Sequence, residues 1–313
     1  MLRKVASGSI QRNMKTDFFM RDSRCAKAAN PWDILRGRGK QILLPIWLMV
    51  PGKLRYHPLT DWLRGLIRPA LRAMLAGEER LLARAWRLHS LEPPNRVLDI
   101  GANEGIFTRH FLRMGAREIL AVEPDAEAIR IFSHRHGQNR RVTLLNLALA
   151  TRNGWSSFYR IKPASGFNTL SRRWFRVQGG IEGEITKVRT ETLPEIFRRF
   201  GIPDLIKVDT EGLEWSILRH LSQPVPFLCF EANLPTFSKE TRALLNHLQP
   251  LMPNHWLCIA ENQMLSSPLS LKAALQLCEG NERVCLDFFF IFPRPCGNNG
   301  EYPLRCRNSE NGT

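Results

Sequence analysis

The chain has 313 residues and a formal net charge of +16, and 43% of its residues are hydrophobic. This content is enough for one large domain with a core, while no run reaches the roughly 20 apolar residues that would span a bilayer. The seven cysteines include no Cys-x-x-Cys pair, and an odd number without a framework favours reduced thiols and a cytoplasmic location.

The first 90 residues carry most of the excess positive charge and are predicted to form a basic N-terminal extension. Pro45 and Pro51 prevent a long helix in its first part, which we expect to be partly disordered. Apolar residues recur at helical spacing from Asp61 to Leu88, so an amphipathic helical segment follows. Three roles stay open: a solvated arm, a peripheral contact with an anionic membrane at the inner surface, or binding of nucleic acid without sequence specificity.

The segment Arg96-Val-Leu-Asp-Ile-Gly-Ala-Asn-Glu-Gly105 predicts a strand, a tight loop and the start of a helix. The strand leads into Asp99, and Gly101 and Gly105 let the backbone turn sharply and approach a ligand closely. This is the first βα unit of a doubly wound nucleotide-binding fold. Asn103 stands where the dehydrogenase fingerprint needs a glycine for a pyrophosphate, so S-adenosylmethionine fits this loop better than NAD.

A second strand is expected at 118–123 and ends in the acidic residue Glu123. An acid about twenty residues beyond the glycines can accept hydrogen bonds from both hydroxyls of a ribose. The alternative is that Glu123 only caps the helix that begins near Asp125. Its place after Asp99 and the glycines favours the role in cofactor binding.

Strands and helices alternate from Asn95 onward, which indicates an α/β fold with a parallel sheet. The last apolar run has no helix after it, so an antiparallel final strand is expected. The prediction is a Rossmann-like fold with a seven-stranded, mostly parallel sheet, helices on both faces and an antiparallel last strand. Strands are expected at 96–100, 118–123, 142–147, 205–209, 227–232, 255–260 and 284–292, and helices near 105–114, 125–135, 191–200, 212–221 and 238–248.

Two stretches outside this series, Gly154–Ile161 and Lys187–Thr190, alternate apolar and polar residues. We expect them to add a further pairing at the edge of the sheet. Residues 161–187 are expected to form a loop over the site. The aromatic residues Trp174 and Phe175 in this loop either stack on a ligand or seal the core.

The domain is expected to span residues 91–295, with residues 1–90 as the extension and residues 296–313 as a disordered polar tail. Cys229, Cys258 and Cys285 lie in apolar, strand-like runs. We therefore expect these three thiols in the core of the domain.

Three polar residues, Lys207, Asp209 and Glu211, alternate around the end of the strand predicted at 205–209. In an open α/β sheet, ligands bind outside the carboxyl ends of the strands, where the strand order reverses. The three residues are therefore candidates for catalysis: Asp209 as the base that takes a proton from an acceptor, Glu211 as the second choice, and Lys207 to orient Asp209 or stabilise negative charge. The alternative is a buried Lys–Asp pair, with Glu211 capping the next helix.

The following strand ends in Glu231 and Asn233, which are expected beside Asp209. Carboxylate and amide oxygens at adjacent strand ends can bind a hard divalent cation, as they do in metal-dependent catechol methyltransferases. This likeness is one of position alone, so we assign no metal ligand and leave the question of a metal open.

Two signatures of nucleic-acid methylation are missing at this place. Methylation of the adenine amino group typically uses Asn/Asp-Pro-Pro-Tyr/Phe, where this chain has Asp209-Thr-Glu-Gly212. Cytosine C5 chemistry needs Pro-Cys there, whereas Pro295-Cys296 follows the last strand. A methyltransferase or binder directed at nucleic acid through its basic arm is therefore the second hypothesis. A non-catalytic scaffold is disfavoured because the cofactor loop and the Lys207 group are both intact.

With these motifs in order, the chain resembles the FkbM family of S-adenosylmethionine-dependent methyltransferases from about residue 95 to 292. The family usually methylates a hydroxyl group of a sugar, a polyketide or another small molecule. The matching segments are Val97-Leu-Asp-Ile-Gly-Ala-Asn-Glu-Gly105, Ala121-Val-Glu-Pro-Asp125, Asn146-Leu-Ala-Leu-Ala150, Ser165-Gly-Phe-Asn-Thr169, Val188-Arg-Thr-Glu-Thr-Leu193, Ile206-Lys-Val-Asp-Thr-Glu-Gly-Leu-Glu214 and Phe230-Glu-Ala-Asn233.

The resemblance implies S-adenosylmethionine as the cofactor and a hydroxylated small molecule as the acceptor. It also implies that a group of residues holds the cofactor, with Asn146 and Ala148 near its adenine. The other members of this group are Asp99, Gly101, Asn103, Gly105 and Glu123. The chain departs from the family at Thr210, where an aliphatic residue is usual, and the basic extension is not part of the family core.

Overall fold

The computed structural model describes residues 81–161, 165–178, 183–261, 264–281 and 283–294. These residues all belong to one compact unit, Leu75–Thr313. The expectations for residues 1–80, for the tail at 296–313 and for residues 162–164 and 179–182 of the expected loop lie outside the described residues. No helix of the described part is long and apolar enough to cross a membrane.

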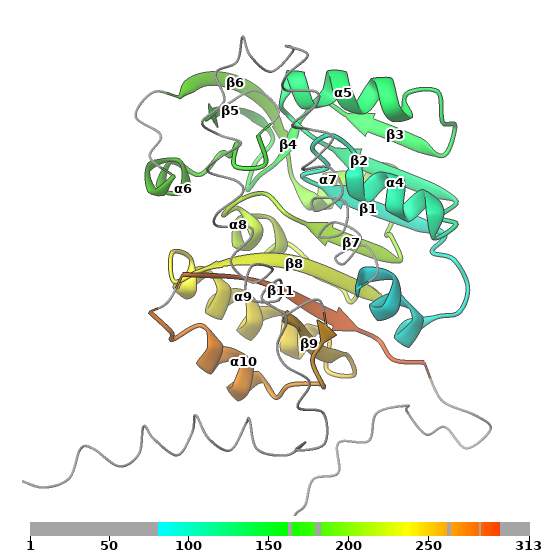
Figure 1. The fold of residues 1–313 in the computed structure, drawn as a ribbon, viewed down its shortest axis with the longest axis vertical. Helices are drawn as coiled ribbons and strands as arrows, with labels where there is room; N and C mark the ends of the chain where they lie inside the picture. Colours follow the sequence, from blue (N-terminus) through cyan, green and yellow to red (C-terminus); the bar gives the residue numbers. More distant parts are fainter. Residues whose placement is uncertain (1–80, 162–164, 179–182, 262–263, 282, 295–313) are drawn as a thin grey trace, which may run out of the picture. The chain divides into compact units, whose positions relative to one another are not determined.

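The main sheet has eight strands in the order β10-β9-β11-β8-β7-β1-β2-β3 (Figure 1). Adjacent strands of this sheet pair in parallel with two exceptions. β11 lies antiparallel between β8 and β9, and β10 is antiparallel to β9. The predicted seven strands and antiparallel last strand are confirmed, and the two-residue β10 adds an eighth. The strands are β1 (Arg96–Ile100), β2 (Glu118–Val122), β3 (Val142–Leu145), β7 (Leu205–Val208), β8 (Phe227–Leu234), β9 (Trp256–Glu261), β10 (Met264–Leu265) and β11 (Val284–Ile291).

A separate three-stranded sheet holds β4 (Ala148–Leu149), β6 (Glu184–Glu191) and β5 (Gly154–Arg160) in that order. The prediction that the alternating segments pair at the edge of the main sheet was wrong. The backbone turns directly after β3, where the Leu147 N–H donates to the Leu145 carbonyl, so β4 leaves the main sheet and pairs with β6 instead. Phe158 on β5 faces inward and is buried, whereas Trp155 is exposed.

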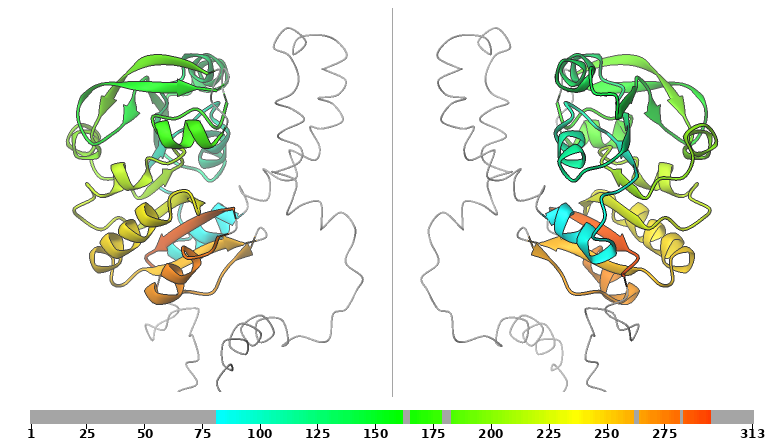
Figure 2. Two further views of the ribbon diagram at one scale, coloured as in Figure 1. Left: turned by 90° about the vertical axis from the view of Figure 1, so that its left-hand side faces the viewer. Right: turned by 90° about the vertical axis from the view of Figure 1, so that its right-hand side faces the viewer.

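Described helices lie on both faces of the main sheet, as predicted (Figure 2), whereas α6 (Arg172–Val177) lies beside the small sheet (Figure 1). The other described helices are residues 81–89, α4 (Ile106–Arg113), α5 (Ala126–His136), α7 (Leu193–Phe200), α8 (Glu214–Leu218), α9 (Ser238–Leu251) and α10 (Leu271–Leu277). One core face gathers Leu98, Ile206, Leu228 and Phe288 of the sheet with α7, α8, α9 and α10. The other gathers Val97, Leu205, Phe227 and Phe289 with α4 and residues 81–89.

Two of the described helices, the short α6 and α10, were not predicted. α6 falls within the expected loop at 161–187 and begins where the Ser171 hydroxyl accepts a hydrogen bond from the Trp174 N–H. Trp174 and Phe175 are both buried, against Phe237 and Tyr159 respectively, so they seal the core. The thiol of Cys285 is exposed on β11, which contradicts its predicted place in the core, whereas Cys229 and Cys258 are buried as expected.

The helix of residues 81–89 belongs to the core of this unit by its contacts. Leu82 and Ala85 are buried on the sheet, and the ring of Trp86 lies 5.8 Å from that of Phe227. The Trp86 indole N–H also donates to the Glu92 carbonyl at 2.8 Å. The division between extension and domain at residue 90 stays a prediction. A shortened protein that began at residue 91 would lack this helix.

We expect Trp86→Ala to lower the free energy of unfolding by about 3–5 kcal/mol, because a large aromatic ring leaves a buried site and a cavity remains. Urea unfolding of the full chain measures this change. The matched control is Arg87→Ala on the exposed side of the same helix, which should stay within about 0.5 kcal/mol of the parent. Equal effects of the two variants would contradict the packing of this helix on the sheet.

Candidate active site

The ends of β1 and β7 meet backbone to backbone. Gly101 follows β1 with φ +78°, and a Cβ built on it would lie 1.8 Å from the carbonyl oxygen of Asp209. The Asp209 N–H in turn donates to the Ile100 carbonyl at 3.0 Å. Only glycine combines this conformation with this close approach. The loop after β1 and the loop after β7 therefore form one continuous wall.

The loop after β1 is tied to the acid that follows β2. Asn103 has φ +47°, and its backbone N–H donates to Glu123 Oε2 at 2.9 Å. Glu123 Oε1 accepts the N–H of Asp125 at 2.8 Å. The cap of α5 is Asp125, whose side chain accepts the Glu127 N–H, so Glu123 does not serve as the helix cap. Burial raises the pKa of Glu123 to about 7.

A buried charge network lies behind the wall. Lys207 Nζ donates to Asp209 Oδ2 at 3.0 Å and sits 4.3 Å from the centre of the Phe107 ring. Burial alone would lower the pKa of Lys207, but the carboxylates of Asp209 and Asp99 outweigh it and raise that pKa. Lys207 is therefore a cation at every ordinary pH. Asp99 is fully buried and accepts the Thr108 hydroxyl at 2.7 Å.

The loop Asp209–Gly212 is held from two sides. Glu214 Oε1 accepts the N–H and the hydroxyl of Thr210, both at 3.0 Å, and Oε2 accepts the Gly212 N–H at 3.0 Å. On the other side, the Thr169 hydroxyl donates to the Glu211 carbonyl at 2.9 Å. Glu211 itself has φ +57°, a conformation rare for a residue with a side chain. β7 ends at Val208, so the backbone of the turn that follows it sets the directions of the Asp209 and Glu211 side chains. The alternation of side chains along a strand does not extend to these two residues.

Three carboxylates converge beside this loop. One oxygen each of Asp209, Glu211 and Glu231 lies within 4.8 Å of the others. The Asn233 side-chain N–H₂ donates to both Glu211 Oε2 and Glu231 Oε1 at 3.1 Å. Burial, followed by the charges of Glu231 and Asp209, raises the pKa of Glu211 well above its ordinary value. The arrangement has the oxygen ligands for a cation, although the Lys207 ammonium already neutralises part of its charge.

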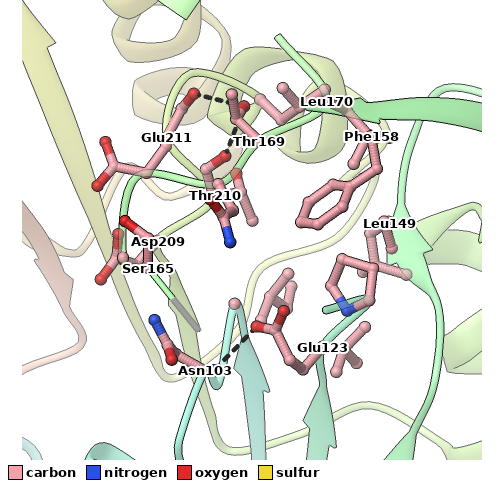
Figure 3. Close-up of a pocket in the computed structure, with 18 residues that line it drawn as sticks. Asn103, Glu123, Leu149, Phe158, Ser165, Thr169, Leu170, Asp209, Thr210 and Glu211 are labelled. Atoms are coloured by element: carbon pink, nitrogen blue, oxygen red, sulfur yellow. Dashed lines mark hydrogen bonds between the residues drawn. The ribbon is translucent and has the colours of Figure 1, made fainter. Parts of the chain in front are cut away.

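A cavity opens between the strand ends of the main sheet and the small sheet, with a volume of about 630 Å³ that includes the part open to solvent. Glu123 and Asn103 lie at one end, and Phe158 and Leu149 face Asp209 and Thr210 across it (Figure 3). The full lining is Ile100, Gly101, Asn103, Val122, Glu123, Pro124, Ala148, Leu149, Phe158, Ser165, Gly166, Asn168, Thr169, Leu170, Asp209, Thr210, Glu211 and Leu213.

Six of the predicted site residues line this cavity: Gly101, Asn103, Glu123, Ala148, Asp209 and Glu211. The other four, Asp99, Gly105, Asn146 and Lys207, do not. Lys207 acts on the cavity only through Asp209, and Asp99 lies buried below the loop. Gly105 caps α4 and its carbonyl accepts His136 Nε2–H, so it shapes the loop. Asn146 is exposed at the turn after β3.

The sequence analysis did not identify the wall of the cavity that the small sheet and the segment between β5 and α6 form. Phe158 lies on β5, whose pairing was predicted at the edge of the main sheet, and Leu149 lies on β4, a strand that was not predicted. The segment Ser165–Leu170 was expected only as part of a loop over the site. The signal that could have identified it is the run Ser165-Gly-Phe-Asn-Thr169, whose polar side chains are spaced to bond backbone on both sides.

Comparison with protein families finds a match that includes the strands and loops described above. Residues 99–251 match the sequence profile described as the methyltransferase FkbM domain. The chain contains a methyltransferase FkbM domain. The match covers β1 through α9, which includes both loops that line the cavity. A search of curated proteins finds no match.

Solved structures similar to this chain include a methyltransferase and a protein with bound S-adenosyl-L-methionine. One is a precorrin-6y C5,15-methyltransferase from Geobacter metallireducens, with 14% identity and a TM-score of 0.35 over 66% of this chain and 85% of that one. Another is fibrillarin from Aeropyrum pernix with bound S-adenosyl-L-methionine, with 13% identity and a TM-score of 0.36 over 67% and 74%. At this level of similarity neither structure indicates the acceptor.

The cofactor of the FkbM domain is S-adenosylmethionine, and the lining of the cavity fits it on two counts. Glu123 has lone pairs left for the hydroxyls of a ribose, beside the apolar side chains of Leu149 and Phe158. Asn103 Oδ1 is buried without a partner among the described residues, and a ligand amino group would supply one.

Replacing Gly101 with Ala should abolish tight cofactor binding and lower the free energy of unfolding by about 2 kcal/mol or more, because the new Cβ meets the Asp209 carbonyl in a left-handed conformation. Calorimetric titration and urea unfolding measure the two effects. Gly280→Ala is the control, since its nearest neighbour would be 3.9 Å from the new Cβ. Binding that survives in Gly101→Ala would contradict the close approach of the two loops.

Affinity for S-adenosylmethionine should rise as the pH rises through 7. Glu123 has a pKa of about 7, and a carboxyl group can accept two ribose hydroxyls fully only in its ionised form, whose fraction grows with pH. If only the ionised form binds, the dissociation constant is about tenfold larger at pH 6 than at pH 8. Titrations across this range test the idea, and Glu123→Gln should bind weakly with this tenfold dependence removed. An unchanged pH dependence in Glu123→Gln would assign it to another group.

Proposed function

We propose that the FkbM domain transfers a methyl group to a hydroxyl of a small molecule, such as a sugar or a polyketide. S-adenosylmethionine supplies an activated methyl group when it is bound. The observation that carries the proposal is that Asp209 and Glu211 line the same cavity as Glu123. A proton acceptor therefore adjoins the cofactor site, which the methylation of a neutral hydroxyl needs.

Asp209 is the proposed base. Its Oδ2 accepts the Lys207 ammonium at 3.0 Å, which fixes the carboxylate in one orientation while its side chain remains partly exposed to the cavity. Lys207 also balances the negative charge that gathers beside an acceptor oxygen as its proton leaves. The residues that support Asp209 are buried, so its position is set before an acceptor binds.

Glu211 is the proposed second carboxylate of the site. Its raised pKa makes the protonated form more accessible than in an ordinary glutamate, and in this form the side chain donates a hydrogen bond to an acceptor oxygen and does not remove a proton. The bonds from Asn233 and the Glu214 clamp hold it beside Asp209. Asp209 and Glu211 then differ in role because their charge environments differ.

The character of the cavity supports a small, uncharged acceptor. Within the described part of the chain, its lining contains the acids Glu123, Asp209 and Glu211 and no Lys or Arg. A polyanion such as nucleic acid would therefore meet acidic side chains there and no basic side chain of the described lining to bind its phosphates. The nucleic-acid hypothesis depends on the basic arm, most of which falls in residues 1–80 and so outside the described residues. The hypothesis of a membrane contact depends on the same residues and stays untested.

Asp209→Asn should lower kcat by about 10²–10³-fold, because the acceptor hydroxyl loses its base, while the dissociation constant of S-adenosylmethionine stays within about twofold. The assay follows label from S-adenosylmethionine into a panel of hydroxylated sugars and polyketides, run beside their amino analogues and RNA. Glu118→Gln, an exposed carboxylate on β2, is the control that should keep full activity.

Two results would overturn the proposal. The first is full turnover by Asp209→Asn at unchanged cofactor affinity. The second is transfer to the amino analogues or to RNA with none to any hydroxyl.

A further inference from the structure

Residues Ser165–Leu170, here called the strap, cross the cavity between β5 and α6. All of the strap except Phe167 lines the cavity. It faces the loops of the main sheet from the side of the small sheet (Figure 3). Two neighbouring residues of the strap, Asn168 and Thr169, are bonded to opposite sides of the site.

Asn168 is bonded to the cofactor side. Its Nδ2 donates to Asp125 Oδ2 at 2.5 Å, and its Oδ1 accepts the Ile161 N–H at 2.9 Å. Asp125 is also the residue whose backbone N–H donates to Glu123. The strap is thus fastened to the turn that holds the ribose-binding carboxylate. The side-chain amide is needed for this, because one end donates to a carboxylate while the other accepts from an N–H.

Thr169 is bonded to the acceptor side. Its side chain is 1% exposed, and its hydroxyl donates to the Glu211 carbonyl while accepting the Ser171 N–H at 2.8 Å. Its backbone pairs in both directions with Tyr159 of β5, at 2.8 and 3.1 Å. The loop Asp209–Gly212 is therefore anchored to the small sheet through one buried hydroxyl.

We propose that Asn168 and Thr169 are positioning residues for methyl transfer, which set the spacing between the cofactor turn and the acceptor loop. Neither side chain is assigned to the reacting atoms: Asn168 acts through the turn that holds Glu123, and Thr169 acts through the loop that holds Glu211. Because the two residues are adjacent in the chain, their Cα atoms are about 3.8 Å apart, which limits how far the two anchored segments can separate. The inference rests on the proposed function for the role of the acceptor loop, and on the cofactor assignment for the role of Glu123.

The two residues have separable effects. Loss of Asn168 releases the cofactor turn, so it changes the affinity for S-adenosylmethionine. Loss of the Thr169 hydroxyl releases the Glu211 carbonyl, so it changes the order of the acceptor loop while Glu123 keeps its contacts. A merely structural role would lower stability alone and would produce no such division.

The test uses the full chain with S-adenosylmethionine and needs no acceptor. Calorimetric titration should show the dissociation constant about tenfold higher in Asn168→Ala and within about twofold in Thr169→Val. Hydrogen exchange at saturating cofactor should show the amides of residues 205–215 exchanging about tenfold faster in Thr169→Val than in the parent. Thr169→Ser, which keeps the hydroxyl, should restore slow exchange.

The controls separate this result from unfolding. Thr143→Val on the exposed side of β3 makes the same chemical change outside the site, and the amides of β8 report whether each variant is folded. Parent-like exchange in Thr169→Val, or equal loss of cofactor affinity in both variants, would overturn the proposal. Since no acceptor is used, a failure to detect methyl transfer to hydroxyls would count against the proposed function and leave these measurements unaffected.

Discussion

The contact on which this site depends is the approach of Gly101 to the carbonyl of Asp209. Two parallel strands, β1 and β7, end at the same level, and their loops leave no room for a Cβ between them. The loop after β1 and the loop after β7 are thereby in contact through their main chains. Side chains then act on a frame that is already set: Glu123 on one loop, Glu214 and Thr169 on the other.

The charges of the site are arranged around this frame. Lys207 lies below it and donates to Asp209, and its charge also lowers the pKa of Asp99, against the larger rise that burial causes. The Asn233 amide donates to both Glu211 and Glu231, and burial together with the charges of Glu231 and Asp209 raises the pKa of Glu211 well above its ordinary value. Two acids that line the cavity, Asp209 and Glu211, therefore lie in different charge environments.

Much of this could be predicted from sequence because the signals are local. Gly101, Asn103 and Glu123 follow strands of strong apolar pattern, and Asp209 follows a strand that is buried on both faces. Asn146 was expected near the adenine of the cofactor, but it does not line the cavity, because the chain turns outward directly after β3. Phe158 and the strap depend on pairing between β5 and β6 across a long intervening segment, and on single side-chain hydrogen bonds that no periodicity reveals.

The place of β11 affects how the chain is assembled. This strand comes last in the described sequence, yet it lies between β8 and β9, which precede it. During synthesis both of those strands expose an unpaired edge until residue 291 is available, whereas β1, β2, β3, β7 and β8 can already form a sheet among themselves. The half of the protein that carries the cofactor loops is therefore able to form first, and closure of the sheet waits for the phenylalanine-rich strand near its end.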